Sequence, residues 1–337
     1  MNTFDSKYSG FLLIKEMMET VETVRNFNRS CTKEIAQVVD KQRRLFLTGE
    51  GSSRIFPAKN LIRKSLQKGS RLFVATDGAR QASEYDLSDF VVFCASNSGK
   101  TKEVISLAKK LVASGHKWCY GLTANEGTLL EQTCTRTFKL NCSKEQTVAA
   151  TKSVIEQALF YESILEYIQG KDRLDTSILA DAIYETLTMP IDNEIVDMAT
   201  RTPIIYFAGY NDGVAEELTL KTNEITRKKS DYLEGTYAVH GIEEVMNPNE
   251  VVVIVDPIDE EIDKFNDVLV KGVGLDVIAI ANRETAFPTI KVPDIGDLTP
   301  YVYLCAGWNL LVEIGLSMEI NLDKPQRARK VGNEFVG

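Results

Sequence analysis

Short apolar runs alternate with helix-like segments along most of this chain of 337 residues. The runs show almost no polar alternation, so both faces of each strand are expected to be buried. Strands of this kind, connected by helices, are typical of parallel sheets that helices cover on both faces. The sequence therefore predicts an α/β fold, with strands near residues 44–48, 72–75, 90–95, 118–122, 137–141, 203–208, 251–255 and 276–281.

The alternation of strands and helices occurs twice, which indicates two similar α/β halves. A helical stretch from 151 to about 200 separates them, and the length is sufficient for two domains at roughly 150 residues each. We expect an N-terminal helical segment (1–30), a first α/β domain (31–170), a helical connector (171–200), a second α/β domain (201–322) and a C-terminal tail (323–337).

The composition argues against several classes of function. The formal net charge is −9, from 39 Lys and Arg against 48 Asp and Glu. The sequence also has no basic stripe of the kind that binds nucleic acid. The six cysteines form no C-x-x-C pair and there are only two histidines, so no metal site, disulfide framework or cofactor is implied. With neither a signal peptide nor an apolar run of about 18 residues, we expect a cytoplasmic protein that does not bind membranes.

Two turns of the first half combine glycine with hydroxyl side chains directly after a strand. The first is T-G-E-G-S-S at 48–53, and the second is S-N-S-G-K-T at 96–101. Each turn leads into a helix, whose first N–H groups are unpaired and carry the positive end of the helix dipole. Such a place suits a phosphate. The candidate donors are Gly51, Ser52, Ser53, Ser96, Asn97, Ser98 and Thr101.

Helix capping is the other interpretation of these turns, because Ser and Asn are preferred N-caps. A single turn would favour capping. Two turns in neighbouring strand–helix units, both at carboxyl ends of strands, favour a ligand instead. Neither turn has the glycine pattern of a nucleotide-binding loop.

These motifs, together with E-Q-T-V-A-A-T-K-S at 145–153, resemble the sugar isomerase (SIS) family of phosphosugar-binding domains. The last segment is similar to part of the isomerase half of glucosamine-6-phosphate synthase. The resemblance implies a tandem pair of SIS domains over almost the whole chain, in which the two turns hold a phosphate and Val148, Ala150 and Lys221 contact the sugar. In the second half, D-P-I-D-E at 256–260 stands where a second phosphate turn would fall, so one phosphosugar site per chain is expected.

The second half supplies three residues that match the catalytic positions of the family's amino-sugar isomerases. Glu224 lies in a K-x-x-E segment, His240 follows sixteen residues later in an H-G pair, and Lys330 follows a D-x-P sequence at 323–325. The resemblance implies that Glu224 moves the proton between two carbons, that His240 exchanges a proton with the ring oxygen, and that Lys330 holds the open-chain sugar or forms a Schiff base with it. By composition alone, Glu224 would be a solvated helix acid paired with a nearby lysine.

The activity implied by the resemblance is that of a phosphosugar isomerase and deaminase. It would convert an aminohexose 6-phosphate, such as glucosamine 6-phosphate, to a ketohexose 6-phosphate and ammonia. Deglycation of fructosamine 6-phosphates and simple ketose–aldose isomerisation remain alternatives, and a non-catalytic sugar-phosphate sensor is an alternative of another class. The family also implies a homodimer or larger oligomer, formed through the second domain, in which His240 comes from the neighbouring subunit and the tail closes the site.

Overall fold

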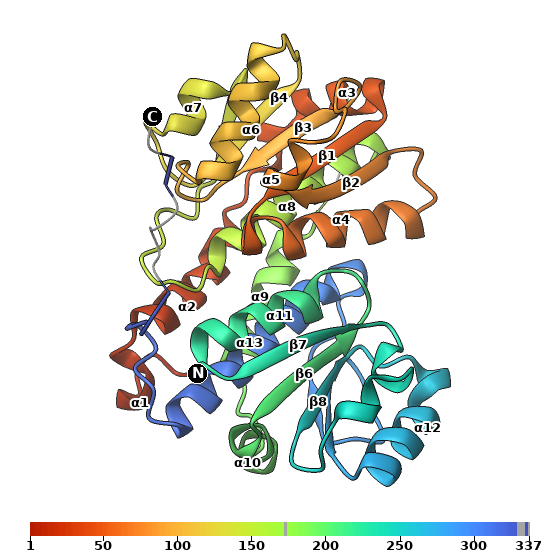
Figure 1. The fold of residues 1–337 in the computed structure, drawn as a ribbon. Coiled ribbons are helices and arrows are strands. Elements are labelled where there is room, and N and C mark those ends of the chain that lie inside the picture. Colours follow the sequence, from red (N-terminus) through yellow and green to blue (C-terminus); the bar gives the residue numbers. More distant parts are fainter. Residues whose placement is uncertain (172–173, 329–333, 336–337) are drawn as a thin grey trace. The chain divides into compact units, whose positions relative to one another are not determined.

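The computed structural model describes residues 1–171, 174–328 and 334–335, and it contains two compact units. The first-sheet unit comprises Glu22–Gln146, Ala150–Ser177 and the C-terminal residues 334–335. The second-sheet unit comprises Met1–Val21, Thr147–Ala149 and Ile178–Ala328. Each unit is built on one five-stranded sheet (Figure 1).

The first-sheet unit has parallel strands in the order β2-β1-β3-β4-β5. The strands are β1 (Arg44–Gly49), β2 (Phe73–Gly78), β3 (Val91–Ala95), β4 (Cys119–Thr123) and β5 (Arg136–Lys139). The helices are α3 (Lys33–Gln42), α4 (Ile55–Gln67), α5 (Ala79–Ala82), α6 (Lys102–Ala113), α7 (Leu129–Thr133) and α8 (Lys152–Ile168), with 3-10 turns η1 (Arg29–Thr32) and η2 (Gly51–Ser53).

Successive residues of the strands enter two apolar clusters on opposite faces of this sheet. Leu45 and Leu47 pack with residues of α3, α4 and α8, whereas Phe46, Val92 and Cys94 pack with residues of α5, α6 and α7. Because helices cover both faces, every position of a central strand is buried, which accounts for the continuous apolar runs in the sequence.

The second-sheet unit repeats this arrangement with parallel strands in the order β10-β9-β8-β6-β7. Numbered from the first strand of each unit, both sheets have the order 2-1-3-4-5. The strands are β6 (Ile204–Gly209), β7 (Lys229–Glu234), β8 (Val251–Val255), β9 (Asp276–Ala281) and β10 (Thr289–Lys291). The helices are α1 (Ser6–Ser9), the start of α2 (Leu12–Arg25), most of α9 (Thr176–Thr188), α10 (Asn193–Arg201), α11 (Val214–Ile225), α12 (Ile262–Phe265), the π-helical η6 (Asn266–Val273) and α13 (Thr299–Ser317), with 3-10 turns η3 (Tyr237–Val239), η4 (Ile242–Val245), η5 (Asp259–Glu261) and η7 (Gly296–Leu298).

Helix α13 is apolar on nearly all sides and is buried along most of its length, with Trp308 fully inside. Such a helix must be enclosed by other elements, and α10 and α11 both pack on it. Among the residues described, no helix combines the length and the apolar character that crossing a membrane requires.

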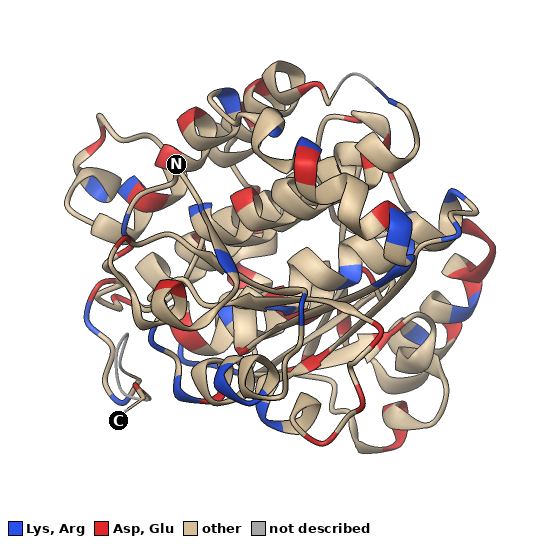
Figure 2. Ribbon diagram, turned by 90° about the horizontal axis from the view of Figure 1, so that it is seen from above, with Lys and Arg blue, Asp and Glu red and all other residues tan. Residues whose placement is uncertain are grey.

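The α/β fold with two parallel sheets, each flanked by helices, is confirmed. All eight expected strands are present, but the sequence does not predict β7 or β10. The five segments expected from the sequence, with their boundaries, stay predictions. Along the ribbon, Lys and Arg are interspersed with Asp and Glu (Figure 2).

Candidate functional site

The two hydroxyl-containing turns lie side by side at the carboxyl edge of the first sheet. Strands β1 and β3 are adjacent and parallel, with Thr48 opposite Cys94. After β1 the chain adds β2 on one side, and after β3 it adds β4 on the other. Such a reversal of strand order is the switch point at which open parallel sheets bind ligands. The topology therefore brings the predicted phosphate residues together at a favourable position.

The first turn comes directly after β1 and packs closely against the end of β3. Gly51 has a φ of 54°, a left-handed conformation that favours glycine. A Cβ on Gly49 would lie 3.0 Å from a carbonyl oxygen of β3, so glycine allows the two strand ends to approach. Ser52 is buried. The carbonyl of Ser53 accepts a hydrogen bond from Gln157 Nε2 at 2.6 Å, which ties the turn to α8.

Glu50 places an acid inside this turn, where an anion is expected to bind. Its carboxylate is directed at α5 and accepts a hydrogen bond from the N–H of Ala79 at 2.9 Å. Burial raises the pKa of the Glu50 carboxyl, and the hydrogen bond from Ala79 opposes that rise. The carboxylate is therefore held by backbone donors of a neighbouring segment.

The hydroxyl groups of the second turn gather around Ser96, which is almost fully buried. Ser96 Oγ lies 2.8 Å from Thr101 Oγ1 and 3.4 Å from Ser98 Oγ. The N–H of Lys100 donates to Ser98 Oγ at 3.3 Å, and the N–H of Thr101 donates to Ser96 Oγ at 3.4 Å. These N–H bonds are long, so the same donors can turn to a bound anion at the start of α6.

Asn97 supports this turn through its side chain. Its Nδ2 donates to Glu145 Oε2 at 2.6 Å and to Ser153 Oγ at 2.9 Å. The side-chain amide hydrogens are thereby committed within the protein, which leaves the backbone N–H of Asn97 as the group that could bind a phosphate.

Glu145, the first residue of the E-Q-T-V-A-A-T-K-S segment, joins the second turn to α8. Besides binding Asn97, its buried carboxylate accepts hydrogen bonds from the N–H of Thr151 at 2.7 Å and from the hydroxyl of Ser153. A carboxylate at a helix N-terminus also interacts favourably with the helix dipole. No role for Glu145 is predicted from the sequence alone. A glutamate six residues before a helical Thr-Lys-Ser is a weak signal, and it gains meaning only from these contacts.

Two of the predicted sugar contacts, Val148 and Ala150, stay predictions. Ala150 belongs to the first-sheet unit and directly precedes Thr151, whereas Val148 belongs to the second-sheet unit. The loop containing Val148 is anchored there by Glu16 of α2, whose buried carboxylate accepts hydrogen bonds from the N–H of Thr147, at 3.3 Å, and from its hydroxyl.

Gly99→Ala is expected to destabilise the protein and to weaken phosphosugar binding. Gly99 has a φ of 65°, and an added Cβ would lie 2.4 Å from the Cβ of Thr128. The left-handed conformation costs about 1–2 kcal/mol for a residue with a Cβ, and overpacking adds about 1–3 kcal/mol. Urea unfolding measures the first effect, and titration with a hexose 6-phosphate measures the second.

Gly127→Ala is the matched control for this variant. Gly127 has the same φ of 65°, but nothing lies within 4 Å of an added Cβ. It should therefore show only the conformational cost and leave binding unchanged. Equal losses of stability in the two variants would contradict the proposed close contact between the turn and the start of α7.

The C-terminal residues 334–335 lie against the second turn. The N–H of Phe335 donates to the carbonyl of Lys100 at 2.9 Å, and Glu334 forms an antiparallel bridge with Thr101. The ammonium of Lys109 lies 4.0 Å from the centre of the Phe335 ring, within the range of a cation–π contact. The sequence predicts a tail that closes the site, but not this contact.

In the second-sheet unit, α11 carries an acid–lysine–acid row. Lys221 is fully buried, with its Nζ 3.2 Å from Glu217 Oε1 and 2.8 Å from Glu224 Oε2. Glu217 is also fully buried, whereas 19% of the Glu224 side chain is exposed. Burial by itself lowers the pKa of Lys221, but Glu224 and Glu217 outweigh it and raise the pKa. The lysine predicted to contact the sugar thus lies between two acids, where it orients Glu224.

Glu224 lines a pocket of about 470 Å³ together with part of the C-terminal tail. The other lining residues are Asn223, Arg227, Lys228, Lys229, Pro325, Gln326, Arg327 and Ala328. Lys330, the third predicted catalytic residue, lies two positions after Ala328 and outside the described residues.

The D-x-P sequence anchors this part of the tail. The carboxylate of Asp323 accepts hydrogen bonds from the N–H groups of Leu12 and Leu13, at 2.8 and 2.9 Å, and so caps the start of α2. Arg227 donates to the carbonyls of Lys324, at 2.7 Å, and Asn321, at 3.3 Å. The aspartate of the motif therefore has a structural role.

His240 is exposed and follows the 3-10 turn η3. Its Nε2 lies 3.2 Å from the Nζ of Lys264 on α12, so its side-chain partner among the described residues is Lys264 and not Glu224. Its contribution to a neighbouring subunit's site stays a prediction.

The turn after β8, D-P-I-D-E at 256–260, carries three acids where a second phosphate turn would fall. Arg283 pairs with two of them, at 3.0 Å from Asp256 and 2.8 Å from Asp259. The turn corresponding to the phosphate turn is thus occupied by an internal ion-pair network, which the sequence alone did not indicate.

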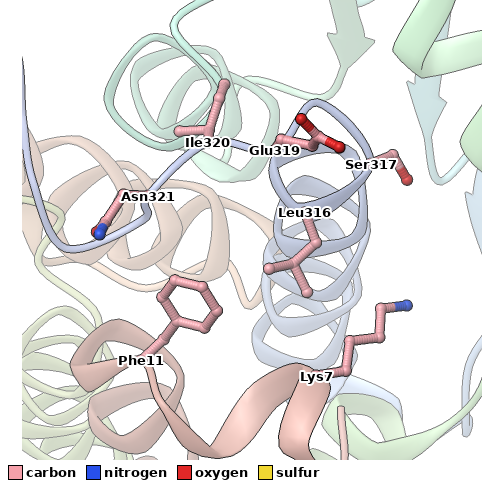
Figure 3. Close-up of a pocket in the computed structure, with 7 residues that line it drawn as sticks. All are labelled: Lys7, Phe11, Leu316, Ser317, Glu319, Ile320 and Asn321. Atoms are coloured by element: carbon pink, nitrogen blue, oxygen red, sulfur yellow. The ribbon is translucent and has the colours of Figure 1, made fainter.

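A second pocket of this unit, of about 450 Å³, lies between the start of the chain and the end of α13 (Figure 3). Phe11 and Leu316 face each other in it, and Lys7 and Glu319 lie at its rim. The ammonium of Lys7 is bound to Glu313 at 2.6 Å. None of the predicted site residues that the structure describes lines this pocket.

The chain is similar to known proteins in sequence and in fold. Residues 39–167 match the family model of the SIS domain. No curated protein matches the chain by sequence.

Solved structures resemble the chain over nearly its whole length. Tagatose-6-phosphate ketose/aldose isomerase from Escherichia coli has a TM-score of 0.79 at 17% identity, with 95% of this chain and 97% of that chain covered. The C-terminal domain of glucosamine-fructose-6-phosphate aminotransferase from Francisella tularensis has a TM-score of 0.75 at 18% identity, with 93% and 98% covered. For glucosamine-6-phosphate deaminase from Thermotoga maritima the TM-score is 0.72 at 19% identity, with 94% and 98% covered. Residues 39–167 are therefore similar to the SIS domain, and the chain shares its two-sheet fold with these structures.

Proposed function

We propose that this protein is a phosphosugar isomerase and deaminase that acts on an aminohexose 6-phosphate. The observation that carries the proposal is the cluster of Ser96, Ser98 and Thr101 hydroxyls at the switch point of the first sheet. Structures with the same fold include an enzyme named as a ketose/aldose isomerase and one named as a glucosamine-6-phosphate deaminase. Both names describe chemistry on a sugar 6-phosphate.

The proposed reaction moves a proton and then releases the amine. In the open-chain aminohexose, a base removes the proton from the carbon that bears nitrogen, C2, and C1 takes up a proton, so that the aldehyde becomes a hydroxymethyl group and the amine becomes an imine at C2. Water then hydrolyses the imine to the ketone, and ammonia leaves. The sum is aminohexose 6-phosphate plus water giving ketohexose 6-phosphate plus ammonia, with no external oxidant or reductant.

Glu224 is the proposed base, because it is the partly exposed acid of the α11 row and lines a pocket. Lys221 positions it with a 2.8 Å ion pair. We further propose that Lys330 of the tail holds the open-chain sugar or forms a Schiff base with its carbonyl. A homodimer in which a second copy supplies His240 as the acid for ring opening completes the site. The free state of all six cysteines is compatible with a cytoplasmic location.

Incubation of the purified protein with glucosamine 6-phosphate tests the proposal. Release of ammonia together with fructose 6-phosphate is the expected result. A panel of other phosphosugars distinguishes the alternatives, because an isomerase would give ketose without ammonia and a deglycase would release a substituted amine. Saturable binding without any product across the panel would favour a sensor and contradict the enzymatic proposal.

Replacing both Ser96 and Ser98 by alanine is expected to weaken phosphosugar binding by a factor of roughly 100 or more. Each lost hydrogen bond to a dianion costs about 1.5–3 kcal/mol, and 1.4 kcal/mol corresponds to about tenfold in affinity. Calorimetric titration of hexose 6-phosphate measures the change.

The control removes two hydroxyls from the same region. Ser106 and Ser114 donate only to backbone carbonyls of α6, at 2.8 Å each. The variant with alanine at both positions should retain its affinity for the sugar phosphate. If the Ser96 and Ser98 variant also retained it, the anion site would lie elsewhere.

A further inference from the structure

Another pocket, of about 680 Å³, lies between α5 and α6 of the first-sheet unit. The two helices pack on each other on one face of the sheet (Figure 1). A volume of this size is within the usual range for small-ligand sites. None of the predicted phosphate or sugar residues that the structure describes lines this pocket. It is therefore separate from the candidate phosphate site.

Three cations line this pocket, against the single carboxylate of Glu103. Arg80 comes from α5, whereas Lys102 and Lys110 come from α6, and all three side chains are exposed. Within the described part of the chain, none of these three cations has a carboxylate partner. The chain as a whole is acidic, with a formal net charge of −9, so this positive excess is local. An anionic ligand would supply the missing counter-charge.

Arg80 and Lys110 converge on the half-buried Ser83. The Nη1 of Arg80 donates to Ser83 Oγ at 3.3 Å, and the ammonium of Lys110 donates to the carbonyl of Ser83. Two like charges beside one residue repel each other, and the oxygens that they contact here are neutral. A dianion bound between the two cations would offset this repulsion and accept charge-assisted hydrogen bonds from both. This end of the pocket therefore fits a phosphate group.

The remainder of the pocket is polar and contains no aromatic ring. Lys102 and Lys110 are eight residues apart on α6, which is about 12 Å at 1.5 Å per residue. Beside Lys102 lies Glu103. Ligand hydroxyl groups can accept a hydrogen bond from an ammonium and donate one to a carboxylate. Since none of the described lining residues is aromatic, a nucleobase would have no ring on which to stack.

We propose that this pocket is a second binding site, specific for the phosphate ester of a polyhydroxy compound such as a sugar or a sugar alcohol. Arg80 and Lys110 are assigned to the phosphate, and Lys102 and Glu103 to the hydroxyl groups. The inference goes beyond the proposed function and does not depend on it. Because salt screens exposed charges, this site should bind more weakly than the turn around Ser96, which is almost fully buried.

Calorimetric titration with sorbitol 6-phosphate tests the proposal. This probe has no carbonyl group, so it cannot be isomerised and the heat reports binding alone. The expected result for the wild-type protein is two binding events per chain, one tight and one weaker. Sorbitol lacks the phosphate and should give neither event. Adenosine 5′-monophosphate carries the same dianion on a nucleoside, and it should give the weaker event with a lower affinity than sorbitol 6-phosphate does.

Two double variants assign the events to their sites. Changing both Arg80 and Lys110 to glutamine should weaken the second event at least about tenfold, since a lost charge-assisted hydrogen bond costs more than a factor of ten. The tight event and the activity should remain. Changing both Ser96 and Ser98 to alanine should have the opposite effect, with loss of the tight event and retention of the weaker one.

The control variant removes one arginine and one lysine from elsewhere in the same unit. Arg136 and Lys139 of β5 are partly exposed and pair with Glu34 and Glu126. Changing both to glutamine alters the net charge by the same amount as the pocket variant does. Both binding events should persist in this control.

The outcomes separate this inference from the proposed function. A weaker event that is absent from the wild type, or that the control also loses, would overturn the second site. Equal affinity for the nucleotide would overturn the polyol assignment. Loss of the tight event in the Arg80 and Lys110 variant would make the pocket part of the first site and also overturn the inference. If the wild type shows only the weaker event, and the Arg80 and Lys110 variant loses it, the inference holds while the predicted phosphate site at Ser96 fails.

Discussion

Glu224→Gln is expected to reduce turnover of the phosphosugar by roughly 10²–10⁴-fold, the usual contribution of a general base. Glutamine has the shape of glutamate and can still accept a hydrogen bond from Lys221, but it cannot take up the proton. Since the predicted phosphate donors belong to the two turns of the first sheet, affinity for the sugar phosphate should change by no more than a few-fold. Product formation and calorimetric titration measure the two quantities separately.

Glu194→Gln is a suitable control for this variant. Glu194 is an exposed acid near the start of α10, so the substitution makes the same chemical change away from the pocket. The control should keep wild-type activity. Activity of Glu224→Gln comparable to that of the control would remove Glu224 from the mechanism. Glu224→Gln should fold, because Lys221 retains Glu217 as a partner.

The buried central strands are the part of the fold that the sequence predicts best. In β8, all five residues are apolar and buried, so a continuous run is sufficient to identify the strand. The strands missed by this reasoning are at the sheet edges. In β7, with sequence K-S-D-Y-L-E, only Leu233 is buried, and β10 has three residues. An edge strand lacks a neighbour on one side and does not need a continuous apolar run.

The positions of the hydroxyl donors follow from the sequence, because a residue directly after a central parallel strand must lie at the carboxyl edge of the sheet. The contacts that hold the turn in place cannot be predicted in this way. Asn97 and Glu145 are 48 residues apart and meet only because α8 returns to the turn after β3. No local pattern contains such a contact, and burial of an acid cannot be read from its identity.

The α11 row is an intermediate case. Glu217, Lys221 and Glu224 have helical spacings of four and three residues, so their contact is predictable once a helix is assumed. Their burial is not predictable, since exposed acid–lysine pairs have the same spacing. The resemblance to a family predicts that Lys221 contacts the sugar, and this stays a prediction. In the structure the lysine is fully buried between two acids.

Lys221→Met is expected to destabilise the second-sheet unit by about 3–5 kcal/mol, the usual cost of leaving one member of a buried ion pair without its partner. Both the Lys221 and Glu217 side chains are fully buried, so water cannot solvate the remaining Glu217 carboxylate. Urea unfolding at neutral pH, followed by circular dichroism, measures the loss.

Combining Lys221→Met with Glu217→Gln separates the stability of this pair from its role in positioning. Replacing both members of a buried ion pair is often close to neutral, so the double variant should recover most of the lost stability. Its activity should stay low, because Glu224 still lacks the ammonium that lies 2.8 Å from its Oε2. Recovery of both stability and activity would show that Lys221 only balances Glu217. Recovery of neither would mean that the methionine disturbs packing rather than charge.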